Sequence, residues 1–376
     1  MAPKKLIRKS VATLFLMAAL TGCIASVSGQ FATEPAIAKA DDATDDTEPV
    51  LDGVQGAWVA YSDFKGAGLY NKSRKKFTSN ADTYFKKLKK DRINTVYFHV
   101  VPCNDAIYPS EYLRWSPYMF QSKPDYDPLE ILVDTAHKYK ISFHAWLNPY
   151  RKTMRVIYNP GKASSTNRIV RITKEIIENY DVDGIHFDDY FYPSRTKGAQ
   201  FRKVPVAKRK NVINRMVKKV YKTVKSYDED LLFGISPAGN VEYAKSIGCD
   251  VKAWLSEDGY MDYIVPQIYW TDQYKVNGKI TKLFTNRLDQ WVELNKNDTP
   301  MYIGLALCYG GSRRSDDLGW CRKNNNIVTQ IKQLRHEGCN GFVLFSSNSL
   351  YSRSTKKEVK NYRAYINTQS APLLAT

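Results

Sequence analysis

Short apolar stretches alternate with longer, more polar segments along most of the chain, starting near residue 56. The short stretches are rich in β-branched and aromatic residues and have the length of buried strands. Apolar residues recur every three or four positions in the segments between them, as in helices that pack on one face. The predicted strands are GAWVAY (56–61), INTVYFHVV (93–101), ISFHAWL (141–147), VDGIHFDDY (182–190), LLFGISP (231–237), DYIVPQIYW (262–270), MYIGLALCY (301–309) and GFVLFSS (341–347).

This alternation indicates parallel strands joined by crossover helices. Eight strand–helix units over roughly 300 residues match a (β/α)8 TIM barrel, an α/β fold of typically about 250 residues. A doubly wound open sheet is the alternative, but it would more naturally carry a glycine-rich phosphate loop after its first strand. We expect a single barrel domain over residues 53–370. The predicted helices are 80–91, 128–140, 165–180, 207–226, 250–257, 281–295, 323–337 and 354–367.

The first 22 residues have the pattern of an export signal. Four basic residues precede the apolar run VATLFLMAAL, which is too short to span a bilayer comfortably. The following LTGC, residues 20–23, resembles the lipobox of bacterial lipoproteins, in which the cysteine receives the lipid. Residues 1–22 are therefore predicted to be a lipoprotein signal peptide and Cys23 the lipidated residue. An ordinary secretory signal, cleaved a little later, is the alternative.

Residues 23–52 are rich in Ala, Ser, Thr and Asp and almost lack large apolar side chains, so we expect a flexible acidic linker. The formal charge of the whole chain is +18, and removal of the four basic residues of the signal still leaves it basic. Such a balance suits an anionic cell wall or lipid headgroups. We expect a lipid-anchored protein at the bacterial cell surface. A nucleic-acid partner is not expected, because the basic residues are scattered over solvated helix faces.

Five cysteines remain after Cys23, and no Cys/His cluster has the spacing of a zinc site. Buried thiols are the favoured interpretation, and a bridge between Cys308 and Cys321 is the alternative. The histidines His99, His144 and His186 fall on consecutive predicted strands. Because the first strand lacks the paired His-x-His of metal-dependent barrel hydrolases, they are predicted to pack or hydrogen-bond inside the barrel. We expect no metal and no cofactor.

The segment DVDGIHFDDYFYP, residues 181–193, is the main candidate for chemistry, because a buried strand there runs into two acids and several aromatics. Reactive groups of such barrels lie at the carboxyl ends of the strands. Strand side chains alternate, so Asp188 is predicted to face the barrel axis and Asp189 the helices, unless the strand ends or bulges between them. Asp188 is therefore the first catalytic candidate.

Glycoside cleavage usually employs two carboxyl groups, roughly 5 Å apart in retaining enzymes and about 6.5–9.5 Å apart in inverting ones. Neighbours on one strand do not reach this geometry easily, so a second acid from another strand is favoured. Asp105 is its first candidate, with Asp63, Glu111, Asp189 and Glu242 behind it. The other strand exits supply polar and aromatic groups that suit a sugar. Predicted substrate contacts are Asn148, Tyr150, Arg151, His186, Gln267, Tyr269 and Trp270.

With these motifs placed, the chain resembles the glycosyl-hydrolase-like family 10, bacterial envelope proteins with a TIM-barrel domain. The matching stretches include HAWLNPYR (144–151), DGIHFDDYFYP (183–193), FGISPAGN (233–240) and DGYMDYIVPQIYW (258–270). The resemblance implies glycosidase activity on bacterial glycans, with peptidoglycan strands a leading substrate class. Chitinase-like enzymes carry a Glu two residues after the equivalent of Asp188, where this chain has Tyr190, so a substrate-assisted chitinase mechanism is disfavoured.

The chain departs from the family pattern in two places. His99, Val100, Val101 and Pro102 stand where the family usually has Gln-x-Arg-Pro, and residues 207–209 read Ala-Lys-Arg instead of Trp-Arg-Arg. The leading hypothesis is a cell-surface glycoside hydrolase that uses Asp188 with a second carboxylate. The missing arginine leaves open a wall-glycan-binding lipoprotein without catalysis. A metal-dependent deacetylase would rest on the histidines alone.

Overall fold

A computed structural model describes residues 53–192, 201 and 203–368. The predicted signal peptide, the lipidation site Cys23 and the predicted acidic linker 23–52 lie outside the described residues, as do Pro193 at the end of the aspartate motif and residues 369 and 370 at the end of the predicted domain. No helix within the described ranges is long and apolar enough to cross a membrane.

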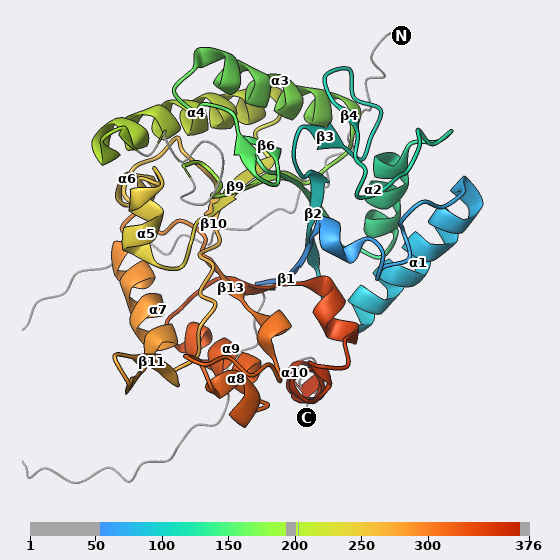
Figure 1. The fold of residues 1–376 in the computed structure, drawn as a ribbon. Helices are drawn as coiled ribbons and strands as arrows, with labels where there is room; N and C mark the ends of the chain where they lie inside the picture. The colour runs from blue at the N-terminus through green and yellow to red at the C-terminus, as the bar shows by residue number, and fades with distance from the viewer. Residues whose placement is uncertain (1–52, 193–200, 202, 369–376) are drawn as a thin grey trace, which may run out of the picture. The chain divides into compact units, whose positions relative to one another are not determined.

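Eight parallel strands form the centre of the domain (Figure 1). The last strand pairs with the first, with Val54 opposite Gly341. Isolated bridges from Ile264 to Met301 and from Gln267 to Gly304 join the remaining two edges, so the sheet closes into a barrel. The strands are β1 (Val54–Val59), β2 (Thr95–Val101), β5 (Ser142–Leu147), β8 (Gly184–Asp188), β9 (Leu232–Ser236), β10 (Tyr263–Ile264), β13 (Tyr302–Leu305) and β14 (Gly341–Leu344). The predicted TIM barrel is confirmed.

Helices surround this barrel, as Figure 1 shows. Each predicted helix is present, and the short helices α5 and α8 are additional. The helices are α1 (Arg74–Lys90), α2 (Pro128–Lys138), α3 (Ala163–Asn179), α4 (Val206–Tyr227), α5 (Val241–Ser246), α6 (Val251–Trp254), α7 (Leu283–Leu294), α8 (Gly319–Arg322), α9 (Asn326–His336) and α10 (Lys356–Thr368). Three 3-10 turns follow strands, namely η1 (Tyr61–Asp63), η3 (Leu307–Tyr309) and η4 (Ser347–Tyr351).

Alternation along the strands creates two apolar layers. Outward side chains pack under the helices, where Phe98 stacks on Phe143 with ring centroids 5.4 Å apart. Inward side chains form a second, smaller cluster inside the barrel. Its large aromatics are Trp58, Tyr97, Trp146 and Tyr263, and the small side chains Ala60, Val265 and Val343 complete it. Glycines provide the space for these rings: a Cβ on Gly234 would lie 2.1 Å from the ring of Tyr263. The interior is therefore a packed core and not a pore.

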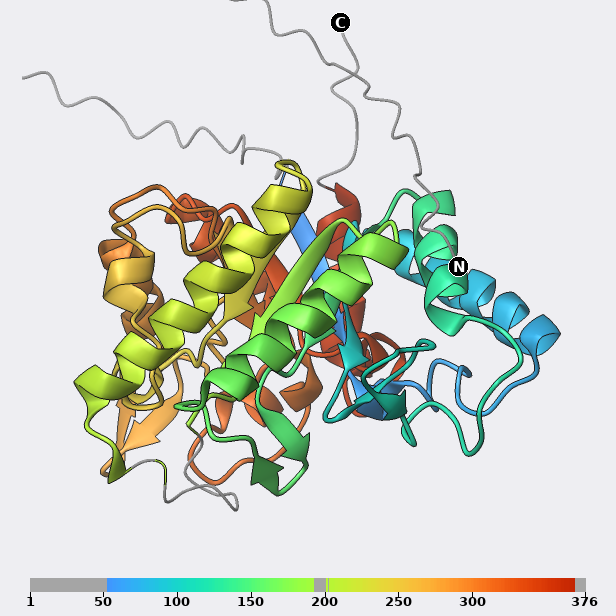
Figure 2. The same ribbon diagram turned by 90° about the horizontal axis from the view of Figure 1, so that it is seen from above.

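The carboxyl ends of the strands carry three small extra sheets. They are β3 (Asp105–Ala106) with β4 (Arg114–Trp115), β6 (Arg151–Thr153) with β7 (Val156–Ile157), and β11 (Tyr274–Val276) with β12 (Lys279–Thr281). Figure 2 shows these connections on one end of the barrel. They surround the end at which the sequence predicts the reactive groups.

The described cysteines are Cys103, Cys249, Cys308, Cys321 and Cys339, and all are free thiols. The alternative bridge between Cys308 and Cys321 is therefore not formed. Cys103, Cys249 and Cys339 are buried, as the favoured interpretation predicts.

Candidate active site

The carboxyl end of β8 carries Asp188 as its last residue, so the chain leaves the sheet before Asp189. His186 lies inside the barrel, whereas Phe187 packs in the outer apolar layer. Asp188 continues this alternation and points inward, with 8% of its surface exposed. The predicted inward direction of Asp188 matches the structure.

Two side chains from the neighbouring strand β5 hold the carboxylate of Asp188. The amide of Asn148 donates a hydrogen bond of 2.8 Å to Oδ2, and the indole N–H of Trp146 donates one of 3.3 Å to the same oxygen. The backbone N–H of Tyr190 donates to Oδ1 at 3.4 Å. The register of the parallel pair, in which Trp146 lies opposite His186, places both donors beside the end of β8.

Burial raises the pKa of Asp188 to about 6, because the charged form loses its hydration. The positive charge of Arg151 and the N–H donors of Tyr190 and Trp146 act in the opposite direction and limit the rise. An unperturbed aspartate has a pKa of about 3.9. Asp188 therefore changes its protonation state near neutral pH, while the donors around it favour the carboxylate.

Asp189 bends away from the strand and reaches the loop after β9. Its Oδ2 accepts a 2.8 Å hydrogen bond from the backbone N–H of Ala238, and its backbone carbonyl accepts one of 2.6 Å from Phe191. Burial, followed by the negative charge of Asp188, raises the pKa of Asp189 to about 7. The residue as a whole is half-buried. Since β8 ends at Asp188, the condition under which Asp189 shares the site is met.

Asp105, the first sequence candidate for the second acid, lies in the short sheet β3–β4. Only 2% of its surface is exposed, and burial raises its pKa. Its charge and that of Asp188 both act on the thiol of Cys103. Among the described residues, no hydrogen bond connects Asp105 with Asp188, whereas Asp189 follows Asp188 directly in the chain. Asp105 and Asp189 both stay candidates for the partner acid.

Arg151 begins the β6–β7 hairpin and lies flat against Tyr190, with its guanidinium carbon 3.8 Å from the ring centroid. Its Nε is buried and has no hydrogen-bond partner within the described part of the chain. The charge of Arg151 acts on Asp188, as its effect on the pKa of that residue shows. Arg151 thus combines a stabilising charge for the carboxylate with a buried Nε–H that has no partner in that part of the chain, and its contact to substrate stays a prediction.

Two predicted substrate contacts are corrected by the structure. His186 has no exposed surface, because its Nε2 accepts from Trp58 at 3.2 Å and its Nδ1 lies 3.1 Å from the hydroxyl of Tyr263. Tyr150 is also fully buried and packs edge-on against Phe191 in the outer apolar layer. Both side chains belong to the core beneath the site and do not face a ligand.

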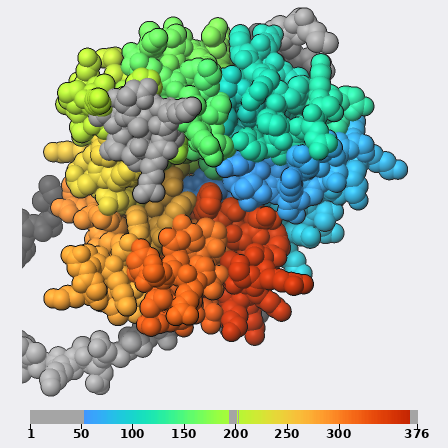
Figure 3. Space-filling view, viewed as in Figure 1, coloured from blue at the N-terminus to red at the C-terminus, as the bar shows by residue number. Residues whose placement is uncertain are grey.

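The remaining predicted contacts follow β10, across the barrel. Gln267 is partly exposed and donates to the carbonyl of Ser236 at 3.0 Å. Tyr269 is partly exposed and packs against Phe345 and the edge of Trp58, with the latter centroids 6.5 Å apart. Trp270 is partly exposed as well. These three residues stay candidates for contact with sugar hydroxyls and rings. Figure 3 shows the end of the barrel at which sectors from distant parts of the chain meet.

The other two barrel histidines behave differently from each other. His144 is bound through Nδ1 to the hydroxyl of Tyr263 at 2.8 Å, as predicted for a packed histidine. His99 stacks face to face on Trp146, with ring centroids 3.7 Å apart, and neither ring nitrogen has a partner among the described residues. Burial keeps the pKa of His99 well below its usual value, so the ring is neutral.

The sequence interpretation did not include Trp146, although its indole N–H donates to the carboxylate of Asp188. Its signal was present, since alternation from His144 through Trp146 to Asn148 places all three on the inner face of β5. At the second departure from the family pattern, Arg209 is the residue that still matches the family, and it has a structural role. Arg209 is buried and donates from Nε to the carbonyl of Val204 at 2.8 Å and from its guanidinium to the carbonyl of Ser246, so it fixes loop packing.

Residues 54–156 and 150–321 match the profile of the family described as Glycosyl hydrolase-like 10. The chain belongs to this family. The predicted class of enzyme, a glycoside hydrolase, is confirmed at the level of the family. The Glycosyl hydrolase-like 10 match covers β1 through β13 and therefore includes both aspartates and their donors.

Relatives of this Glycosyl hydrolase-like 10 member include glycosyl hydrolase YngK of Bacillus subtilis (strain 168) and glycosyl hydrolase DigH of Escherichia coli (strain K12). The identity to YngK is 30% over 278 residues, which cover 58% of this chain and 53% of YngK. The chain thus spans about half the length of YngK. The identity to DigH is 28% over 439 residues, with 95% of this chain and 96% of DigH covered.

Solved structures with the same fold have little sequence identity. The glycoside hydrolase domain of PgaB (BpsB) from Bordetella bronchiseptica superposes with a TM-score of 0.58 at 11% identity, covering 85% of this chain and 99% of that domain. Catalytic domain 2 of the group II chitinase of Ostrinia furnacalis gives 0.58 at 9% identity, covering 85% and 97%. At this identity the likeness establishes the barrel fold alone.

Proposed function

We propose that this protein is a lipid-anchored glycoside hydrolase of the bacterial cell surface that cleaves envelope glycans, with the glycan strands of peptidoglycan as the leading substrate. The observation that supports it best is the pair Asp188 and Asp189. Their pKa values of about 6 and about 7 lie near neutrality, and different surroundings separate them. Two acids with separated pKa values are what general acid catalysis beside a carboxylate requires.

The surroundings assign one role to each acid. Asp188 has N–H donors from Asn148 and Trp146 and the nearby charge of Arg151, all of which favour its ionised form. Asp189 has one backbone donor and the repulsion of Asp188, which favour its protonated form. In the proposed reaction, Asp189 gives its proton to the glycosidic oxygen as the C–O bond breaks. The carboxylate of Asp188 faces the positive charge that develops at the anomeric carbon. Water then adds to that carbon and gives its proton to the Asp189 carboxylate, which restores both acids to their starting forms.

The proposed location and substrate depend on the sequence. The LTGC motif at residues 20–23 supports a lipid anchor at Cys23 and hence a position at the cell surface. The family resemblance and the aromatic and amide groups after β10 support a glycan substrate, since Tyr269 and Trp270 offer ring faces and Gln267 offers an amide. The proposed pair of acids would catalyse hydrolysis near neutral pH without a metal ion.

Turnover of purified peptidoglycan strands and chito-oligomers by the wild type, Asp188→Asn and Asp189→Asn tests this proposal. General acid catalysis alone typically contributes about 100- to 10,000-fold, so each variant should lose activity within or beyond that range. A matched control is Asp181→Asn, because this exposed aspartate precedes the same strand and lies outside the site. Undiminished hydrolysis by Asp188→Asn would remove Asp188 from the mechanism.

The alternative function is a wall-glycan-binding lipoprotein without catalysis. The observation that favours it is the first departure from the family pattern, where buried His99 and Val101 stand in place of the usual glutamine and arginine. Retention of glycan strands by the protein, with no newly formed reducing ends after prolonged incubation, would support binding over hydrolysis.

A further inference from the structure

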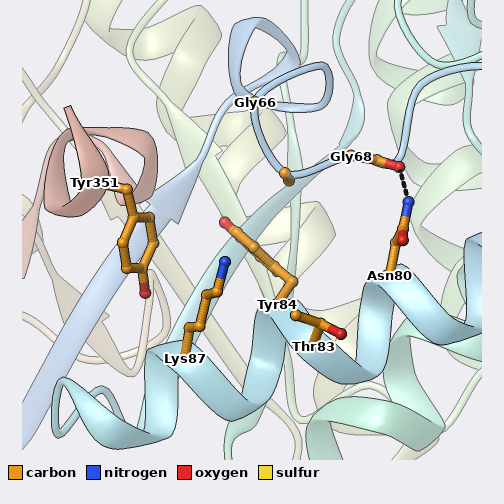
Figure 4. Close-up of a pocket in the computed structure, with 8 residues that line it drawn as sticks. Gly66, Gly68, Asn80, Thr83, Tyr84, Lys87 and Tyr351 are labelled. Carbon is orange, nitrogen blue, oxygen red and sulfur yellow. Dashed lines mark hydrogen bonds between the residues drawn. The ribbon is translucent and has the colours of Figure 1, made fainter.

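A separate pocket lies between the loop after β1, helix α1 and the turn η4 (Figure 4). Its volume is about 220 Å³, and it is lined by Gly66, Ala67, Gly68, Asn80, Thr83, Tyr84, Lys87 and Tyr351. Pockets for drug-sized ligands usually measure about 300–1,000 Å³. This pocket therefore suits a single small unit rather than a length of polymer.

Hydrogen bonds fix the walls of the pocket before any ligand arrives. The amide of Asn80 donates to the carbonyl of Gly68 at 2.6 Å, which ties the loop to α1 (Figure 4). The hydroxyl of Tyr84 donates to Ser347 at 2.6 Å, and Ser347 donates in turn to Asp63 at 3.0 Å. A preformed site loses less conformational entropy on binding.

Lys87 is the charged residue of the lining, and no acid accompanies it there. Figure 4 shows its side chain rising from α1 toward the loop, and its ammonium lies 5.7 Å from the ring centroid of Tyr351. Within the described residues, no carboxylate forms an ion pair with Lys87. Asp91, just after α1, is already bound by Arg363 through hydrogen bonds of 2.6 and 3.0 Å. Asp91 also binds the hydroxyl of Tyr351, and its charge is matched by Arg363. Lys87 thus keeps a positive charge without an ion-pair partner in the described part of the chain.

The other groups suit a sugar better than a bare ion. Tyr351 is 40% exposed and forms an aromatic wall. Thr83 and Asn80 lie along the opposite side, on α1. They donate to the carbonyls of Ser79 and Gly68 and keep their oxygens as acceptors for sugar hydroxyls. We propose that this pocket binds a carboxylate-bearing sugar unit of an acidic glycan, with the carboxylate at Lys87 and the sugar ring against Tyr351.

Two borders of the pocket come from the end of the barrel that carries the aspartates. The pocket borders the loop after β1 and the turn after β14, both of which lie at the carboxyl ends of their strands. Ser347 and Asp63 connect these two segments beneath it. A glycan that carries acidic units would then be held both at this pocket and at the cleavage site. The inference rests on the proposed function for the kind of polymer, but the binding itself requires no hydrolysis.

Titration of the ¹⁵N-labelled protein with galacturonic acid, with galactose and with inorganic phosphate tests the proposal by NMR. Galacturonic acid should shift the amides of Gly66, Gly68 and Lys87 and should bind more tightly than either of the others. Lys87→Met should weaken it about fivefold, the effect of one exposed charge pair of about 1 kcal/mol. Lys86→Met is the matched control, because it removes the same charge from the neighbouring position of α1 without touching the pocket, and it should leave binding unchanged.

Three results would overturn the inference. They are amide shifts elsewhere than in the pocket, equal binding of phosphate and galacturonic acid, and equal weakening by Lys87→Met and Lys86→Met. Hydrolysis of neutral chito-oligomers by Lys87→Met should equal that of the wild type, since Lys87 takes no part in the reaction. Loss of uronate binding with intact hydrolysis refutes the pocket alone, whereas absence of hydrolysis with intact uronate binding refutes the proposed function alone.

Discussion

Replacement of Asn148 by Leu removes the shorter of the two side-chain hydrogen bonds to Asp188 while keeping a side chain of similar size. The lost bond is 2.8 Å long and ends on a carboxylate. Hydrogen bonds to charged groups contribute roughly 1.5–3 kcal/mol, and one pKa unit corresponds to about 1.36 kcal/mol. Because the bond stabilises the ionised form, its loss should raise the pKa of Asp188 from about 6 by roughly one to two units.

The pKa of Asp188 can be followed without a substrate, by the ¹³C chemical shift of its carboxyl carbon across a pH titration. The signal is assigned by its absence in Asp188→Asn. Trp146→Phe is the comparison, because its bond to the same oxygen is longer, at 3.3 Å, and its removal should cause a smaller upward shift. An unchanged titration in folded Asn148→Leu would show that the amide does not hold the carboxylate and would refute this description of the site.

Three further predictions concern pH and stability. If Asp188 acts ionised and Asp189 protonated, kcat/KM should rise with pH through about 6 and fall through about 7, with a maximum between these values. The two limbs of this curve belong to the coupled pair of acids. A profile that stays flat from pH 5 to 9 contradicts the assignment. Tyr263→Phe removes the hydroxyl shared by His144 and His186, so urea unfolding should show a loss of about 1–3 kcal/mol for each nitrogen left unpaired, and unchanged stability would refute the shared bond. Gly234→Ala should lower the melting temperature measured by calorimetry, because the new methyl group would overlap the ring of Tyr263.

The sequence predicted the barrel well because hydrophobic alternation marks each strand independently of its neighbours. The prediction of the element boundaries was wrong where single residues end or begin an element. Pro266 has no backbone N–H for the ladder, and β10 keeps only Tyr263 and Ile264 of the predicted strand 262–270. Asn240 caps the N-terminus of α5, where its side chain accepts from the backbone N–H of Tyr243, and the sequence interpretation predicted no helix in this segment.

Prediction of the site was less complete than prediction of the fold. Asp188 was found because it ends a buried strand, and Asn148 because it follows the neighbouring one. Asp189 was ranked behind Asp105, since alternation alone turns it outward, and only the end of β8 at Asp188 brings it into reach. The sequence predicted that His186 packs inside the barrel, and Trp58 and Tyr263 hold it there, but the burial of Tyr150 depends on Phe191, a contact that no periodicity reveals.

A crystal structure of Asp188→Asn with a bound peptidoglycan oligosaccharide tests the central claim most directly. We expect the scissile glycosidic oxygen within hydrogen-bonding distance of the Asp189 carboxyl, about 2.6–3.2 Å, with the anomeric carbon turned toward residue 188. A glycan bound at this end of the barrel with neither side chain near its glycosidic oxygen, or with another acid in that place, would contradict the proposed reaction.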